Sequence, residues 1–305
     1  MADSKDPGRD PPHLDPLEAA SAPTWRAAYS DRTAALMAAL SQLAYVPFEV
    51  TPASGGQKAV KPGGEQDLAT LLDAGGFRLI SLFNKDDTQA FLAILPGQYA
   101  VLAFRGTTSV NDWMINANVR RVDLPAVPGV RVHCGFLEAF QGCRPEIELA
   151  VAQNVPDTLG LYITGHSLGG GLAQIASAVL ERDNLAACYT FGSPRVGTLG
   201  FDRQVKCPHY RLVNDWDVVP GVPVPWFRGY FHSGDPRLLT PGAKGQMALR
   251  RDRSGVSRFF VDLWALAVGW LQPRFLIVDD HMIWNYRTQL EAIATFRASK
   301  VEPPK

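Results

Sequence analysis

The chain has 305 residues, and its 30 Lys and Arg residues balance 30 Asp and Glu residues to a formal net charge of zero. Nucleic-acid-binding proteins usually carry a basic excess, so this balance argues against a nucleic-acid partner. Hydrophobic residues make up 46% and charged residues 20% of the chain. This composition is typical of a globular enzyme and excludes a largely disordered protein.

The N-terminal segment lacks the features of a signal peptide. Residues 1–22 combine mixed charge with several prolines and contain no apolar core, so we interpret residues 1–24 as a disordered tail. The longest apolar stretch, Phe259–Leu271, contains Asp262 and would span only about 20 Å as a helix, which is too short for a bilayer. We therefore expect no transmembrane segment and a cytoplasmic protein, with non-classical secretion as the alternative.

The cysteines indicate neither a metal site nor a redox motif. They form no CxxC pair and no spacing typical of metal ligands: Cys134, Cys143, Cys188 and Cys207. Scattered thiols of this kind are typical of a reducing compartment. We expect no metal and no organic cofactor.

The first half of the chain predicts a helix, a linker, a short helix and then three strands. Leucines recur at helical spacing in residues 31–45, and a second, shorter helix ends at Gly75 and Gly76. Polar turn residues separate the strands, which favours an antiparallel meander. The expected linker covers residues 52–64, the short helix 66–74, and the strands 77–83, 90–95 and 99–104.

In the second half, predicted strands and helices alternate. Helices are expected at residues 135–154 (with a kink or break at Pro145), 168–180 and 282–296, and strands at 161–164, 187–191 and 210–213. Apolar residues of the last helix form one stripe that includes Tyr286. This alternation predicts an α/β fold: a mostly parallel central sheet with an antiparallel N-terminal part and helices on both faces. We expect a single domain at residues 25–300.

The segment Gly165-His166-Ser167-Leu168-Gly169 matches the pattern G-x-S-x-G. An apolar strand precedes it and a helix follows it, which is the context of a nucleophile elbow. The two outer glycines permit close approach of strand and helix, and the helix N-terminus favours developing negative charge. We predict that Ser167 is a nucleophile; the alternative is an ordinary serine in a glycine-rich turn.

A nucleophilic serine needs a base, and six histidines are available. His281 directly precedes the last predicted helix and follows a strand-like run, so it is the favoured base. His133 and His232 remain as alternatives, whereas the side chain of His166 should point away from the serine.

The base in turn needs an acid that orients it. Asp215 and Asp217 both follow the strand at residues 210–213, and spacing alone does not rank them. The chain order Ser, Asp, His matches that of the α/β-hydrolases.

Taken together, four segments resemble the class 3 lipases, the fungal-type lipases of the α/β-hydrolase superfamily. They are residues 104–109 with Asp112-Trp113, residues 132–136, 164–171 and 214–223, and a weaker match surrounds Asp280-His281. The resemblance extends over roughly residues 31–296.

This resemblance implies a role for particular residues. The family nucleophile matches Ser167, and the family histidine matches His281. The family acid precedes a hydrophobic-Val-Pro step, which selects Asp217. The family oxyanion hole matches Thr107 and the backbone N–H of Leu168, where two donors would face the oxygen that becomes negative.

The segment after Thr107 resembles the family lid. Residues 109–119 are short and amphipathic, and we expect Trp113, Met114, Ile115 and Asn116 to contact substrate or cover the site. A fixed surface helix is the alternative. The chain also departs from the family in lacking a leader and in the length between Asp217 and His281, where Phe259–Leu271 is either a core helix or an interfacial flap.

The resemblance predicts a serine carboxylester hydrolase, and most specifically a triacylglycerol lipase acting on acylglycerols at a lipid–water interface. An esterase or phospholipase A1 is the alternative within this class, and a peptidase or thioesterase on the same fold is another. A non-catalytic lipase-like binding module is the alternative outside it. A monomer is favoured.

Overall fold

The computed structural model describes most of the predicted domain. It covers residues 14, 28–46, 49–52, 58–61, 67–85, 88–107, 120–125, 127–223, 229–241, 247–251 and 278–299. The predicted lid at residues 109–119 and the apolar stretch Phe259–Leu271 lie outside the described residues, and so does the predicted tail apart from Leu14.

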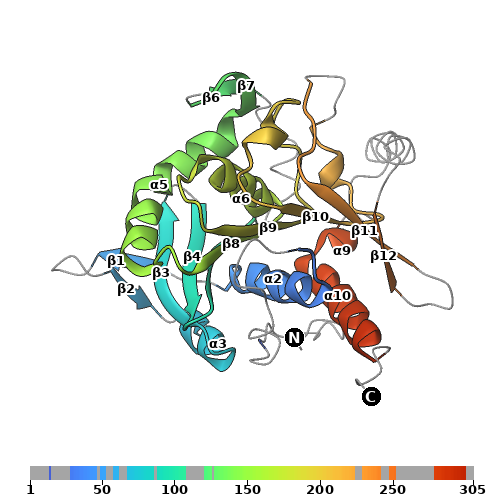
Figure 1. Cartoon of the computed structure of the whole chain (residues 1–305), viewed down its shortest axis with the longest axis horizontal. Helices are drawn as coiled ribbons and strands as arrows, with labels where there is room; N and C mark the ends of the chain where they lie inside the picture. The colour runs from blue at the N-terminus through green and yellow to red at the C-terminus, as the bar shows by residue number, and fades with distance from the viewer. Residues whose placement is uncertain are drawn as a thin grey trace, which may run out of the picture.

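A sheet of eight strands forms the centre of the molecule (Figure 1). Its spatial order is β12-β11-β10-β9-β8-β5-β4-β3. The five strands from β5 to β11 are parallel, while β3 and β4 at one edge and β12 at the other are antiparallel to their neighbours. The strands are β3 Arg78–Lys85, β4 Thr88–Leu95, β5 Tyr99–Phe104, β8 Gly160–His166, β9 Leu185–Phe191, β10 His209–Asn214, β11 Asp235–Pro241 and β12 Met247–Arg251.

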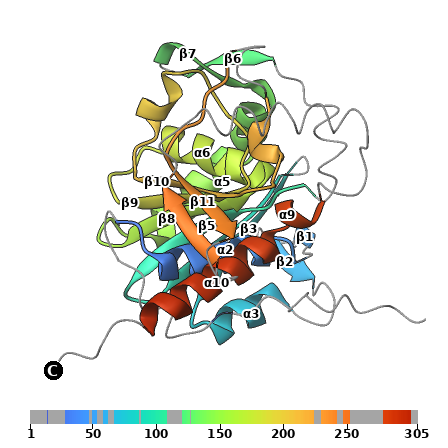
Figure 2. The ribbon, with the colours of Figure 1, turned by 90° about the vertical axis from the view of Figure 1, so that its right-hand side faces the viewer.

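Helices cover both faces of this sheet, as the two views in Figures 1 and 2 show. One face carries α2 (Asp31–Leu43), α3 (Leu68–Ala74) and α10 (Ile283–Ala298), and the other carries α5 (Cys134–Asn154) and α6 (Leu168–Val179). The predicted fold class is therefore confirmed.

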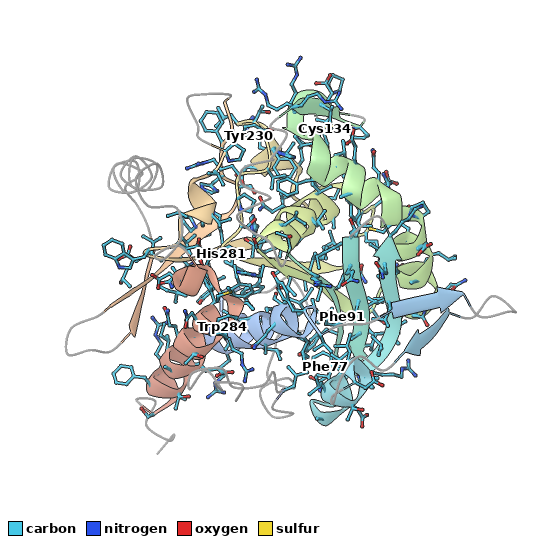
Figure 3. The ribbon with its side chains drawn as sticks, turned by 180° about the vertical axis from the view of Figure 1, so that it is seen from behind. Phe77, Phe91, Cys134, Tyr230, His281 and Trp284 are labelled. Atoms are coloured by element: carbon cyan, nitrogen blue, oxygen red, sulfur yellow. The ribbon has the colours of Figure 1, made fainter. Side chains whose placement is uncertain are left out.

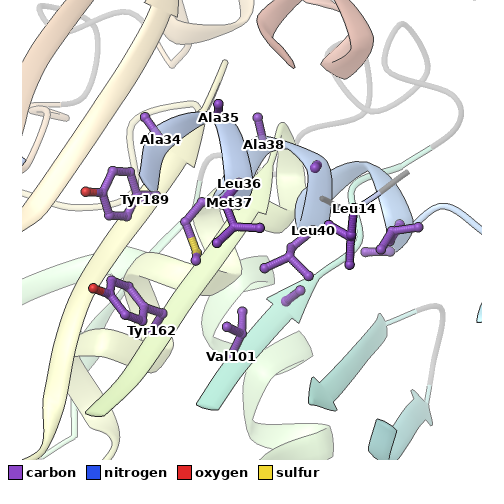
Figure 4. Close-up of a cluster of buried hydrophobic side chains, with 14 of the residues drawn as sticks. Leu14, Ala34, Ala35, Leu36, Met37, Ala38, Leu40, Val101, Tyr162 and Tyr189 are labelled. Atoms are coloured by element: carbon purple, nitrogen blue, oxygen red, sulfur yellow. The ribbon is translucent and has the colours of Figure 1, made fainter. Parts of the chain in front are cut away.

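Each face has its own hydrophobic core, because successive residues of a strand point to opposite sides. Val101 of β5 packs beneath α2 with Tyr162 and Tyr189, as Figure 4 shows, and Leu14 joins this cluster. Leu102 belongs to the second core, beneath α5 and α6. Burial on both faces explains why the central parallel strands β5, β8 and β9 are largely apolar.

The structure differs from the sequence-based expectations in several places. The linker expected at residues 52–64 contains β2 (Lys58–Lys61), which pairs with β1 (Glu49–Pro52). Strands β11 and β12 were not predicted, because β11 carries two prolines and two charged residues in place of an apolar run. Helix α5 continues through Pro145, so this proline does not break it. A further hairpin joins β6 (Arg121–Leu124) to β7 (Val127–His133).

Candidate active site

Ser167 lies in the tight turn between β8 and α6, with φ of 56° and ψ of −128°. Among the described residues it is the one non-glycine residue with positive φ. Such a conformation costs energy and persists where the surrounding structure enforces it. A Cβ atom on Gly165 would overlap the backbone of Gly169, and one on Gly169 would overlap the carbonyl of Phe104. The two glycines therefore allow β8, α6 and β5 to converge at the serine.

Asp217 and His281 form a buried hydrogen-bonded pair. The distance from His281 Nδ1 to Asp217 Oδ2 is 2.9 Å, and both side chains are at most 3% exposed. The Asp217 carboxylate also accepts hydrogen bonds from the Tyr286 hydroxyl at 2.6 Å and from the Val219 N–H at 2.9 Å. These three donors fix the orientation of the carboxylate.

The elements around this pair come from distant parts of the sequence. Asp217 lies in the loop between β10 and the short helix η2 (Val219–Gly221), whereas His281 ends the helical turn α9 (Val278–His281) at the start of α10 (Figure 3). His281 was expected to follow a strand-like run, but the residues immediately before it are helical. The aspartate in contact with His281 is Asp217, and Asp215 is more exposed.

His166, the residue before Ser167, and Gly192, next to the residue that binds the Ser167 N–H, both lie close to the His281 ring. The ring of His166 lies 4.5 Å from the His281 ring, between centroids, and the Ser167 N–H bonds to the carbonyl of Phe191 at 2.9 Å. A Cβ atom on Gly192, next to Phe191, would approach two atoms of the His281 ring to 3.0 Å. Ser167 Oγ and His281 Nε2 are buried, and neither has a hydrogen-bond partner among the described residues. These two atoms are therefore available for a substrate or for each other.

The predicted oxyanion-hole residues lie at the ends of neighbouring elements. Thr107 follows β5 by three residues, and Leu168 is the first residue of α6, where a backbone N–H lacks an acceptor within the helix. A Cβ atom on Gly106 would lie 3.2 Å from Ser167 Cβ, so the segment before Thr107 passes close to the serine.

Two other histidines are buried in neutral form. His133 packs against Phe136 and Tyr230, and burial lowers its pKa to about 4. His209 bonds to Thr190 and Ser233, and burial lowers its pKa to about 3, with the charge of Arg211 acting in the same direction.

The sequence did not identify several residues that contact the pair. Tyr286 belongs to the apolar stripe of the last helix, a pattern that indicates core packing, and its hydroxyl also accepts the Asn214 N–H at 2.9 Å. Asn214 Nδ2 in turn bonds to the carbonyl of Asp280, next to His281, at 3.0 Å. No local pattern marks either contact.

The predicted substrate-contacting residues, Trp113, Met114, Ile115 and Asn116, lie outside the described residues. In the part of the chain that is described, His, Cys, Asp and Glu side chains nowhere gather in a group of three or more suited to a metal ion. No helix of that same part has both the length and the apolar character needed to cross a membrane.

Comparison with known proteins connects these features to a family. The model of the family "Lipase (class 3)" matches residues 101–227, a segment that contains the elbow and Asp217. A secreted mono- and diacylglycerol lipase of Fusarium solani is 37% identical over 148 residues, which cover 47% of this chain and 44% of that protein. A lipase of Rhizomucor miehei is 31% identical over 166 residues, covering 50% of this chain and 46% of that protein. The matches thus span less than half the length of these two relatives.

The solved structure of lipase II from Rhizopus niveus has the same fold. It matches with a TM-score of 0.56 at 26% identity and covers 70% of this chain and 82% of that chain.

The similarity to the Fusarium protein, which is named as secreted, contradicts the expected cytoplasmic location. That prediction was wrong because it depended only on the composition of residues 1–22, which does not determine where the protein works. The match to residues 101–227, the elbow and the α/β-hydrolase fold together support a class 3, fungal-type lipase family for this chain.

Proposed function

We propose that this protein is a serine carboxylester hydrolase that acts as a lipase on acylglycerols. The observation that carries this proposal is the buried Asp217–His281 hydrogen bond beside a strained serine elbow. The names of its relatives, a secreted mono- and diacylglycerol lipase and a lipase, support the substrate class. A non-catalytic binding module has no need of a strained serine next to a histidine–aspartate pair.

In the proposed reaction, Ser167 Oγ attacks the ester carbonyl while His281 Nε2 accepts the serine proton. The tetrahedral intermediate collapses when His281 returns this proton to the leaving alcohol, and an acyl-enzyme remains. Water then attacks the acyl-enzyme by the same route and releases the fatty acid. Asp217 holds His281 with Nδ1 protonated and stabilises the imidazolium without taking the proton itself.

Two backbone N–H groups stabilise the negative oxygen of the intermediate in this proposal, those of Thr107 and Leu168. Both belong to segments that converge on Ser167, one from the end of β5 and one from the start of α6. Donors already held in place need no reorganisation during the reaction, which is why such sites accelerate acyl transfer.

The lipid–water interface is the proposed site of action, with residues 109–119 as the lid and Trp113 covering the site. We also propose that the enzyme works outside the cytoplasm, as the name of the Fusarium relative indicates for that protein. A single domain at residues 25–300 and a monomeric state remain predictions. The alternative is an esterase or a phospholipase A1, and assays with different ester substrates distinguish these specificities from that of a lipase.

The test is hydrolysis of p-nitrophenyl esters from C2 to C16, and of emulsified di- and triacylglycerols, by the wild type and Ser167→Ala. We expect Ser167→Ala to lower kcat/KM by at least about 10³-fold. Ser177→Ala is the matched control, because its hydroxyl is buried in the same helix and bonds to the Ala173 carbonyl. Equal activity of wild type and Ser167→Ala would contradict the proposal. A rate that does not rise when the substrate forms an emulsion would contradict a gating lid.

A further inference from the structure

Tyr45 and His166 connect the end of β5 to the backbone of His281. The backbone of Gly106 lies against the Tyr45 hydroxyl, and Tyr45 Oη lies 2.8 Å from His166 Nδ1. On the other side of the same ring, His166 Nε2 lies 2.5 Å from the carbonyl oxygen of His281. Two hydrogen bonds therefore link Tyr45, which packs against the residue before Thr107, to the backbone of the predicted base.

The atoms involved determine the direction of both hydrogen bonds, the one between Tyr45 and His166 and the one between His166 and His281. A carbonyl oxygen only accepts, so His166 Nε2 carries the proton and donates to His281. Burial and the neighbouring His281 keep the pKa of His166 well below its usual range, so its Nδ1 is unprotonated and accepts from the Tyr45 hydroxyl.

The packing around Tyr45 leaves little room for other arrangements. The Arg105 guanidinium lies 5.9 Å from the centre of the Tyr45 ring, and a Cβ atom on Gly106 would overlap the Tyr45 hydroxyl. The same Cβ atom would lie 2.6 Å from the His166 carbonyl oxygen. Tyr45, the elbow and the segment before Thr107 are thus in direct contact.

Two described hydrogen bonds reach the backbone at Asp280 and His281. His166 holds the His281 carbonyl, and Asn214 holds the neighbouring carbonyl of Asp280 at 3.0 Å. Asp217 fixes the His281 ring through Nδ1 but does not restrain the backbone behind it. The hydrogen bond from His166 to the His281 carbonyl therefore helps to set the position of His281 Nε2 relative to Ser167.

We propose that Tyr45 and His166 are positioning residues, which set the placement of the general base His281 relative to the oxyanion-hole segment at Thr107. This inference rests on the proposed function. In this inference, His166 positions His281 and does not contact substrate, although His166 directly precedes the nucleophile in the sequence. Groups that orient a catalytic side chain without touching substrate typically alter activity by about 10- to 100-fold.

Tyr45→Phe is the most direct test, because it removes one hydroxyl and keeps the ring. With a water-soluble p-nitrophenyl ester, we expect kcat to fall by about 10- to 100-fold while KM changes by less than about twofold. Active-site titration with a phosphonate corrects the rate for the fraction of folded enzyme. Tyr162→Phe is the control, because it also removes one buried hydroxyl, in the core beneath α2 where the Tyr162 ring contacts Tyr99 and Tyr189.

Two His166 variants separate positioning from packing. His166→Leu removes both polar contacts, and we expect a loss at least as large as that of Tyr45→Phe. His166→Gln retains one donor and one acceptor, so it should recover part of kcat relative to His166→Leu. An unchanged kcat in Tyr45→Phe, or a loss explained entirely by misfolded enzyme, would overturn the inference.

Proton NMR provides a readout that does not require ester hydrolysis. We expect a downfield imidazole N–H signal that His166→Gln abolishes and Tyr45→Phe shifts. A signal that Tyr45→Phe leaves unshifted would refute the coupling even in an inactive protein. A wild type that hydrolyses no ester would contradict the proposed function itself, whereas an active wild type with a fully active Tyr45→Phe would contradict only the positioning inference.

Discussion

Tyr286→Phe is the substitution for which the structure gives the clearest expectation. The Tyr286 hydroxyl donates to Asp217 Oδ2 at 2.6 Å and accepts the Asn214 N–H at 2.9 Å, and Tyr286 is completely buried. Replacement by phenylalanine preserves the ring and removes both hydrogen bonds. It leaves a buried carboxylate with one donor fewer and a buried N–H without this acceptor.

The expected loss of stability follows from these two contacts. A hydrogen bond to a charged group contributes about 1.5–3 kcal/mol, and one between neutral groups about 1 kcal/mol. We therefore expect the free energy of unfolding to fall by about 3 kcal/mol. With an unfolding entropy near 2.1 cal/mol/K per residue, this corresponds to a decrease in Tm of about 5 °C.

The activity of the folded variant should fall only moderately, because Asp217 keeps its hydrogen bonds to His281 and to the Val219 N–H. We expect kcat on a soluble ester to fall about tenfold with KM nearly unchanged, as is typical when a group that orients a catalytic side chain is removed. Urea unfolding and kcat measurements, with Tyr162→Phe as the control, provide the test. A loss below about 1 kcal/mol together with an unchanged kcat would refute the view that Tyr286 holds the carboxylate.

Three further predictions concern the buried histidine, the oxyanion hole and the elbow. His209 has a pKa of about 3 in the folded protein, against about 6.5 in the unfolded chain, so the unfolded state binds the proton first. Stability should therefore decrease as the pH falls from about 6.5 towards 3, and urea midpoints should show a weaker decrease for His209→Gln. Thr107→Ala should lower kcat about 10²-fold if the threonine hydroxyl helps to bind the oxyanion, and a change below about threefold would restrict the role of Thr107 to its backbone. Gly169→Ala should yield little folded protein by circular dichroism, because its Cβ would overlap the Phe104 carbonyl; a stable, active variant would contradict the observed packing.

Local patterns in the sequence were sufficient for much of the fold. The spacing of leucines predicted α2, and apolar runs with turn residues between them predicted β3, β4 and β5. The elbow was recognisable because a strand, a small-residue turn and a helix follow one another within about a dozen residues. Strands β11 and β12 escaped prediction because their pairing, rather than their composition, makes them strands.

The sequence by itself therefore determined the α/β class and the position of the candidate nucleophile, since both depend on neighbours along the chain. Spacing could not choose between Asp215 and Asp217. The tertiary structure brings Asp217 to His281 across 64 positions of sequence. It also decided the roles of Tyr45, Asn214 and Tyr286, whose contacts join residues 66 to 121 positions apart. Contacts between residues so far apart produce no periodic pattern in the sequence, because they form only when the sheet and its two helical layers have assembled.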